Sequence, residues 1–155
     1  GDTLPSINLM TMTGEGPKPI SLSDISAGKK IVLFAVPGAF TPTCSLQHLP
    51  GFIEKNLEFR NKGVDVVACV SMNDPFVMKA WGEDRKVGED ILMLSDGNGE
   101  FTAAIGLEMD GSGFGLGTRS QRYAMVIDDG VVSALNIETG PGLDVSSAET
   151  ILEQL

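Results

Sequence analysis

Short runs of apolar residues alternate with helix-like stripes along most of the chain. Residues 30–36 and 64–70 are apolar at odd and even positions alike, which is typical of strands buried on both faces of a sheet. Between them, residues 41–60 carry apolar side chains at helical spacing, interrupted at Pro50 and Gly51. Strand, helix and strand form a βαβ unit, so we expect the two strands to be parallel.

The second half of the chain continues with helices and strands and then a hairpin. The pattern predicts a helix over 75–86, a strand over 91–94, a short helix over 101–105, strands over 123–127 and 131–137 joined by a turn at 128–130, and a closing helix over 146–155. Ser146 or Ser147 can cap the closing helix, with Glu149 completing a capping box. The order predicts an α/β fold of the thioredoxin-like kind, with a central mixed β-sheet flanked by helices, as a single domain over residues 1–155.

Size and charge narrow the function classes. The chain has 155 residues, of which 42% are hydrophobic, enough for one core. Its formal net charge of −10 argues against binding to nucleic acid or to an anionic membrane surface. The longest apolar stretch, residues 31–40, is about half of the roughly 20 residues that a membrane span needs.

Targeting and cysteine content suggest a compartment. No basic leader opens the chain, so no signal peptide is predicted and we expect a cytoplasmic protein. Because the chain begins at Gly1 without a methionine, the alternative is an organellar protein whose transit peptide has been removed. Cys44 and Cys69 are the two cysteines, and His48 is the lone histidine. They are too few for a disulfide scaffold or a zinc site, so we expect a reducing compartment and no metal.

Cys44 stands where a strand runs into a helix, the usual place for ligands in α/β sheets. Thr41 followed by Pro42 predicts a helix start, with threonine as the N-cap, and Cys44 comes three residues after that cap. A helix N-terminus favours an anion by about 0.3–2 kcal/mol, which lowers the pKa of a thiol by about one unit. A nearby cation is needed for full reactivity. Without it, Cys44 is an ordinary, partly buried cysteine.

Four other features are candidates for chemistry. Cys69 lies in a valine-rich strand, where a thiol behaves as a small hydrophobe. His48 can share a helix face with Cys44, but it can equally pack or bond to a carbonyl. The glycine-rich stretch 111–117 matches no phosphate-binding motif and is interpreted as a flexible loop. Arg122 shares a face with apolar strand residues, and an arginine facing a core needs a partner or a function, so it is the candidate cation.

Four long motifs resemble peroxiredoxins of the type II, or peroxiredoxin-5-like, subfamily. They are FAVPGAFTPTCSLQHLPGF at 34–52, VVACVSMNDPFVMKAWG at 66–82, LSDGNGEFTAAIG at 94–106 and RSQRYAMVIDDGVV at 119–132. The resemblance extends over the whole chain. It implies a thioredoxin-like fold, reduction of hydrogen peroxide and small alkyl hydroperoxides, a homodimer, and no metal or organic cofactor.

The resemblance also assigns roles to residues. Cys44 would be the peroxidatic nucleophile, oxidised to sulfenic acid. Arg122 would stabilise the thiolate and bind the peroxide. Thr41 would orient the peroxide oxygens, so that its capping and catalytic roles compete for one oxygen. Pro37 would shield the substrate pocket, with Gly38 beside it.

One departure from the family affects turnover. Some type II members carry a resolving cysteine near the C-terminus, but the matching stretch 141–146 has none. We therefore expect single-cysteine turnover with an external thiol, glutathione with glutaredoxin first and thioredoxin second, and keep Cys69 as a possible secondary redox residue. The alternatives are a redox sensor or holdase on the same fold, and a thiol transferase or hydrolase using Cys44 with His48. Phe40, Phe76 and Trp81 are candidates for a dimer interface.

Overall fold

The computed structural model describes residues 1–140 and 142–155; Pro141, part of the stretch that lacks a resolving cysteine, lies outside them. A seven-stranded sheet has the order β2-β1-β5-β4-β3-β8-β9, in which β3, β4 and β5 are parallel and the other pairings are antiparallel. Its strands are β1 (Asn8–Thr13), β2 (Gly16–Ser21), β3 (Lys30–Ala35), β4 (Val66–Ser71), β5 (Leu92–Ser95), β8 (Tyr123–Asp128) and β9 (Val131–Ile137). The predicted fold class, a mixed sheet of the thioredoxin-like kind flanked by helices, is confirmed.

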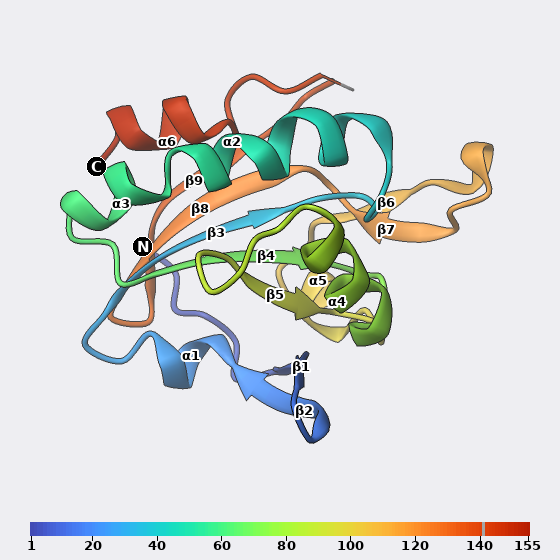
Figure 1. Ribbon diagram of the computed structural model, residues 1–155, viewed down its shortest axis with the longest axis horizontal. Helices are drawn as coiled ribbons and strands as arrows, with labels where there is room; N and C mark the ends of the chain where they lie inside the picture. Colours follow the sequence, from blue (N-terminus) through green and yellow to red (C-terminus); the bar gives the residue numbers. More distant parts are fainter. Residues whose placement is uncertain (141) are drawn as a thin grey trace.

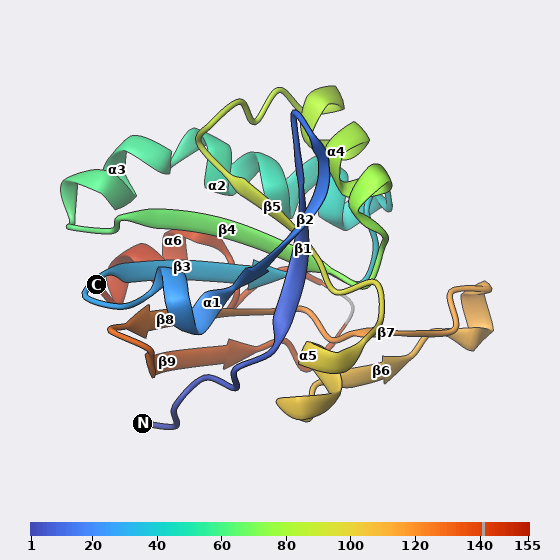
Figure 2. The ribbon, with the colours of Figure 1, turned by 90° about the horizontal axis from the view of Figure 1, so that it is seen from below.

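Helices cover both faces of this sheet, as Figures 1 and 2 show. The π-helix η1 (Cys44–His48) leads into α2 (Leu49–Glu54), and with α3 (Asn56–Asn61), α4 (Pro75–Asp84) and α6 (Ala148–Glu153) it packs on one face. The other face is covered by α1 (Leu22–Ile25), α5 (Glu100–Ala104) and the N-terminal segment. A small hairpin of β6 (Glu108–Asp110) and β7 (Thr118–Ser120), with η2 (Ser112–Phe114) at its tip, projects from the body.

Two apolar cores lie on opposite faces of the sheet. Alternate residues of β3 supply each core, with Val32 and Phe34 on one face and Ile31 and Leu33 on the other. This explains why the sequence of β3 is apolar at both parities. Cys44 and Cys69 belong to the first core.

The predicted helix over 41–60 is broken at a different place. The chain continues as a helix through Pro50 and Gly51 and bends at Lys55, whose φ and ψ are −93° and 6°. Proline lacks the amide that an α-helix needs. The π-helix just before Pro50 makes wider turns, with the Leu49 amide donating to the Cys44 carbonyl, and so accommodates the proline.

The predicted β8–β9 turn and the predicted serine cap of α6 are present, but the predicted capping box is not. Asp129 and Gly130 both have positive φ in the β8–β9 turn, as an Asp-Gly hairpin requires. Ser147 caps α6 by accepting a hydrogen bond from the Thr150 amide. Thr150 therefore occupies the third helical position, and the expected capping box with Glu149 is not formed.

Candidate active site

Cys44 is fully buried at the first turn of η1, where the loop after β3 enters the helix. Its Sγ atom accepts a hydrogen bond from Nη2 of Arg122 at 3.0 Å. Arg122 immediately precedes β8 and is 9% exposed. The first core also contains Ala124 and Val126, which confirms that β8 directs this face toward Cys44. The cation and the thiol that the sequence proposed separately are in contact.

Arg122 is an unusual buried cation. Among the described residues, the ion pairs do not include Arg122. A guanidinium taken out of water needs a compensating charge or hydrogen bonds. The described side-chain partners of the guanidinium are Sγ of Cys44 and Nδ1 of His48, which accept from its Nη2 and Nη1 atoms.

His48 contacts the other terminal nitrogen, Nη1, of the Arg122 guanidinium. Its Nδ1 lies 2.9 Å from Nη1 of Arg122, and its Nε2 lies 2.9 Å from the Ser146 carbonyl. Arginine stays protonated and donates, so Nδ1 accepts and the Nε2–H group donates to Ser146. Burial, together with the charge of Arg122, lowers the pKa of His48 to about 3, against the opposing effects of the Ser146 carbonyl and Glu138.

This arrangement gives no Cys–His pair. The described hydrogen bonds of His48 go to Arg122 and Ser146 instead of Cys44. A neutral imidazole whose acceptor nitrogen is occupied is not available as a general base. The thiol transferase or hydrolase interpretation therefore loses its structural basis. His48 has a structural role instead, because it bonds to the Ser146 carbonyl and to Arg122.

The state of His48 predicts a loss of stability in acid. The unfolded chain takes up the proton near pH 6.5, whereas the folded protein does so near pH 3. Stability is therefore complete above about pH 6.5 and is expected to fall by up to about 1.4 kcal/mol per pH unit as the pH drops toward 3. Denaturant unfolding of the wild type and His48→Gln between pH 6.5 and 5 checks this; equal slopes in the two proteins would contradict it.

Thr41 does not use its hydroxyl as a helix cap. Its carbonyl accepts from the Ser45 amide at 2.8 Å, but its Oγ1 donates to the Gly38 carbonyl at 2.6 Å. The predicted side-chain cap is thus wrong, because the loop brings the Gly38 carbonyl closer than a helix amide. Phe40, with φ of 66°, makes that reversal of the backbone. The lone pairs of Oγ1 remain free to accept from a ligand, so capping and catalysis do not compete.

Several residues that sequence reasoning missed fix this loop. Asn73 accepts from the Ala39 amide at 2.8 Å, and Arg119 donates to the carbonyls of Pro37 at 3.3 Å and Leu116 at 3.0 Å. Trp81 is fully buried and donates to Oγ of Ser45 at 2.8 Å. The expectation that Trp81 is exposed for an interface is wrong, because its indole supports η1.

A cavity of about 510 Å³ opens beside this loop. Pro37, Thr41 and Arg122 line it, together with apolar side chains of the β6–β7 hairpin, among them Met109 and Leu116. The glycine-rich stretch 111–117, expected to be a flexible loop, contains the short 3-10 helix η2, and its Phe114 lines the cavity. Gly38 lies behind Thr41, and a Cβ there would come within 3.1 Å of the threonine methyl group. Cys69 lies in β4 and does not line the cavity.

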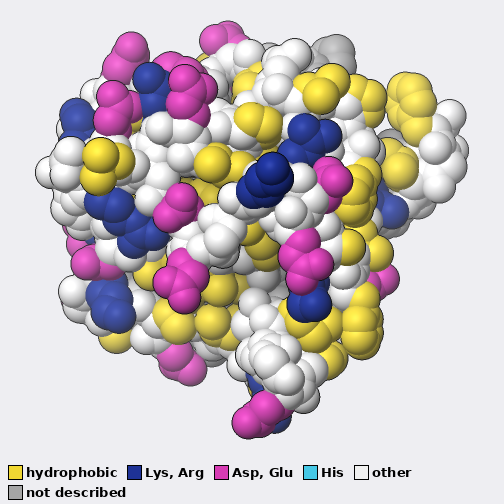
Figure 3. Space-filling model, viewed as in Figure 1, with side chains coloured by type: hydrophobic (Ala, Val, Ile, Leu, Met, Phe, Trp, Pro, Cys, Tyr) yellow, Lys and Arg dark blue, Asp and Glu magenta, His cyan; other side chains and the backbone are white. Residues whose placement is uncertain are grey.

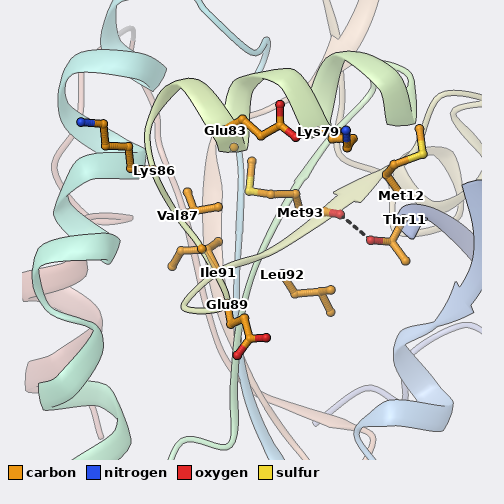
Figure 4. A pocket seen from close by; sticks show the side chains of 12 residues that line it. Thr11, Met12, Lys79, Glu83, Lys86, Val87, Glu89, Ile91, Leu92 and Met93 are labelled. Carbon is orange, nitrogen blue, oxygen red and sulfur yellow. Dashed lines mark hydrogen bonds and ion pairs between the residues drawn. The ribbon is translucent and has the colours of Figure 1, made fainter. Parts of the chain in front are cut away.

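A cavity of about 630 Å³ lies elsewhere, between β1, α4 and β5 (Figure 4). Met12, Val87 and Met93 contribute apolar side chains, and Lys79 and Glu83 form an ion pair at its edge. It contains none of the predicted site residues. On the face drawn in Figure 3, basic side chains are scattered among acidic ones without a continuous basic surface. No helix in residues 1–140 or 142–155 is long and apolar enough to cross a membrane.

Comparisons with known proteins show the family of the chain. The model of the redoxin family matches residues 1–152. The chain is 52% identical to peroxiredoxin-2E, chloroplastic, of Arabidopsis thaliana, over all of this chain and 68% of that protein. Reduced Prx3 of Vibrio vulnificus, in complex with hydrogen peroxide, has a TM-score of 0.95 at 57% identity and covers 99% of this chain and 96% of its own. Peroxiredoxin 5 of Alvinella pompejana has a TM-score of 0.85 at 35% identity, covering 99% and 94%. The chain therefore belongs to the redoxin family and is a type II peroxiredoxin, a thiol-dependent peroxidase.

Proposed function

We propose that Cys44 is the peroxidatic nucleophile of this enzyme. The observation that supports this most is the 3.0 Å contact between its buried Sγ and the buried guanidinium of Arg122. The thiolate attacks the terminal oxygen of the peroxide, so that an S–O bond forms as the O–O bond breaks. The leaving oxygen takes a proton and departs as water or an alcohol. Two electrons pass from sulfur to the peroxide, and Cys44 becomes a sulfenic acid.

Arg122 and Thr41 act on different parts of this step. Arg122 stabilises the thiolate and the charge that develops on the leaving oxygen. The Thr41 hydroxyl donates its hydrogen bond to the Gly38 carbonyl and accepts one from the peroxide O–H, which aligns the O–O bond with Sγ. Pro37 forms the wall of the cavity that excludes water from the reacting atoms.

The substrates are hydrogen peroxide and small alkyl hydroperoxides. The cavity of about 510 Å³ is far larger than hydrogen peroxide, and Met109 and Leu116 give it an apolar side. An alkyl group fits against that side while the peroxide group reaches Arg122. The hydrogen peroxide in the similar Vibrio vulnificus structure supports the smaller substrate.

Turnover uses one cysteine of this chain. Cys69 lies in β4, between β3 and β5, where backbone pairing on both sides holds it in the sheet. Burial and the proximity of Cys44 raise the pKa of the Cys69 thiol well above its usual value, against a smaller opposing effect of Arg122. Cys69 therefore stays a protonated, poorly nucleophilic thiol.

An external thiol then restores Cys44. It attacks the sulfenic sulfur and releases water, giving a mixed disulfide; a second thiol displaces Cys44 and leaves as an external disulfide. Because Cys44 is fully buried, the first turn of η1 must open before a second molecule reaches Sγ. Glutathione with glutaredoxin is our first choice of reductant and thioredoxin the second.

The Cys69→Ala variant tests single-cysteine turnover. We expect its steady-state peroxidase rate with glutathione and glutaredoxin to stay within about twofold of the wild type, since the substitution removes only a small buried group. The assay is run in parallel with thioredoxin. Loss of turnover with both systems while the first oxidation is unchanged would contradict the proposal. Rapid oxidation with no thiol able to reverse it would favour the redox sensor or holdase.

The enzyme acts as a homodimer through the surface around α4. Phe40, in the loop before η1, and Phe76, on α4, are 51% and 64% exposed. The ring centroid of Phe40 lies 6.4 Å from that of Trp81, which is also on α4. We expect Phe76→Ser to shift the protein toward monomer in sedimentation velocity, because the variant loses apolar contact area. The control is Phe114→Ser, since Phe114 is 89% exposed on the hairpin. An unchanged sedimentation coefficient for both variants would contradict this surface.

The protein acts in an organelle and not in the cytoplasm. The chloroplastic relative at 52% identity supports this alternative. Imaging of the full-length gene product with a C-terminal fluorescent tag tests it, and diffuse cytoplasmic fluorescence would contradict it.

A further inference from the structure

The segment after β9 is organised around one carboxylate oxygen. Oε2 of Glu138 accepts hydrogen bonds from the amides of Asp144 and Ser146, both at 2.8 Å, and from the Ser146 hydroxyl at 2.7 Å. Partial burial raises the pKa of Glu138, but these hydrogen bonds outweigh it and lower the pKa below its usual range. The carboxylate is therefore ionised at neutral pH and holds Ser146 in place.

Ser146 links this carboxylate to the active site. It is fully buried, and its carbonyl accepts from Nε2 of His48 at 2.9 Å. His48 in turn accepts from Arg122, and Arg122 donates to Cys44. The Glu138 amide also donates to the Arg122 carbonyl at 3.0 Å. Arg122 is thus held at its backbone and, through Ser146 and His48, at its guanidinium by the same short segment.

These hydrogen bonds determine the direction of the Arg122 guanidinium, because few other contacts restrain it. A long arginine side chain adopts many rotamers, and no ion pair among the described residues fixes this one. Its direction depends on His48, whose ring is oriented by the Ser146 carbonyl. A ring that loses this acceptor can rotate or change tautomer and then present an N–H group to Arg122, which cannot accept it.

We propose that Glu138 is a positioning residue for peroxide reduction, which acts through Ser146 and His48 to aim the Arg122 guanidinium at Cys44. This inference rests on the proposed role of Cys44 and Arg122. Glu138 does not touch the reacting atoms: it fixes the geometry of the cation that does. The competing explanation is that Glu138 only stabilises its own loop.

A double-mutant cycle separates the two explanations. Glu138→Gln removes the charge that holds Ser146, and we expect oxidation of Cys44 by hydrogen peroxide to slow about tenfold. In an Arg122→Ala background the same change should have almost no further effect, because the cation it positions is gone. The matched control is Glu149→Gln, an equal loss of charge on the exposed face of α6.

The outcomes are distinct. An equal slowing in both backgrounds, or an unchanged rate in the single variant, would overturn the positioning role. If Glu138→Gln fails to fold, Ser146→Ala removes only the 2.7 Å hydroxyl contact and is expected to give a smaller slowing that also disappears with Arg122→Ala. Slow oxidation of the wild-type protein would instead refute the proposed function itself.

Discussion

Replacing Arg122 with alanine is expected to slow the oxidation of Cys44 by hydrogen peroxide by about 10²–10³-fold. The variant loses the donor 3.0 Å from Sγ and leaves the thiol in an apolar core without a cation. Removal of one donor that stabilises transition-state charge costs about this much in other enzymes. Alkylation by iodoacetamide, which needs no bound peroxide, reports the reactivity of the thiol separately. Stopped-flow fluorescence of Trp81, whose indole bonds to Ser45 on η1, can follow the oxidation.

Two control variants test whether the charge and the shape of the Arg122 side chain cause this effect. Arg122→Lys keeps the charge but not the planar fork that reaches His48 and Cys44 together, so it should recover only part of the rate. Arg85→Ala removes a half-buried arginine that contacts Asp84, outside the candidate site, and should leave the rate unchanged. An Arg122→Ala protein that oxidises as fast as the wild type would refute the assigned role.

Replacing Thr41 with valine is expected to slow oxidation by about 10²-fold while leaving alkylation of Cys44 nearly unchanged. Valine has the shape of threonine but cannot donate to the Gly38 carbonyl or accept from a peroxide. The thiolate and Arg122 remain, so a reagent that needs no orientation still reacts, whereas the peroxide loses its alignment with Sγ.

Thr41→Ser restores the hydroxyl and serves as the control for the methyl group. The serine variant should regain most of the peroxidase rate, measured as the second-order constant for Cys44 oxidation. A parallel fall in alkylation and oxidation for Thr41→Val would show instead that the hydroxyl only supports the loop.

The strands that the sequence predicts correctly are those whose burial is visible in their pattern of apolar residues. β3 and β4 are apolar at both parities because each lies inside the sheet with a core on either side. The hairpin of β1 and β2 was missed because Pro17 and Pro19 resemble loop residues. In the structure they lie in β2, an edge strand, which tolerates residues without an amide donor.

The site was predictable where chemistry alone identifies a residue. A thiol at a helix start and a buried arginine each demand an explanation, and together they predicted the contact between Cys44 and Arg122. The two bonds of His48 were not predictable, because Arg122 and Ser146 are 74 and 98 residues away along the chain. The Thr41 hydroxyl was assigned to the wrong partner because the backbone reversal at Phe40 has no clear signal in its residue type.

Mapping of the oxidised residue tests the central claim most directly. The reduced protein is mixed with one equivalent of hydrogen peroxide without reductant, quenched within milliseconds with a reagent that traps sulfenic acid, and digested for mass spectrometry. We expect the adduct on Cys44 with Cys69 still a free thiol, and no adduct in Cys44→Ser. An adduct on Cys69, or an unmodified Cys44 after peroxide has been consumed, would contradict the assignment of Cys44 as the peroxidatic nucleophile.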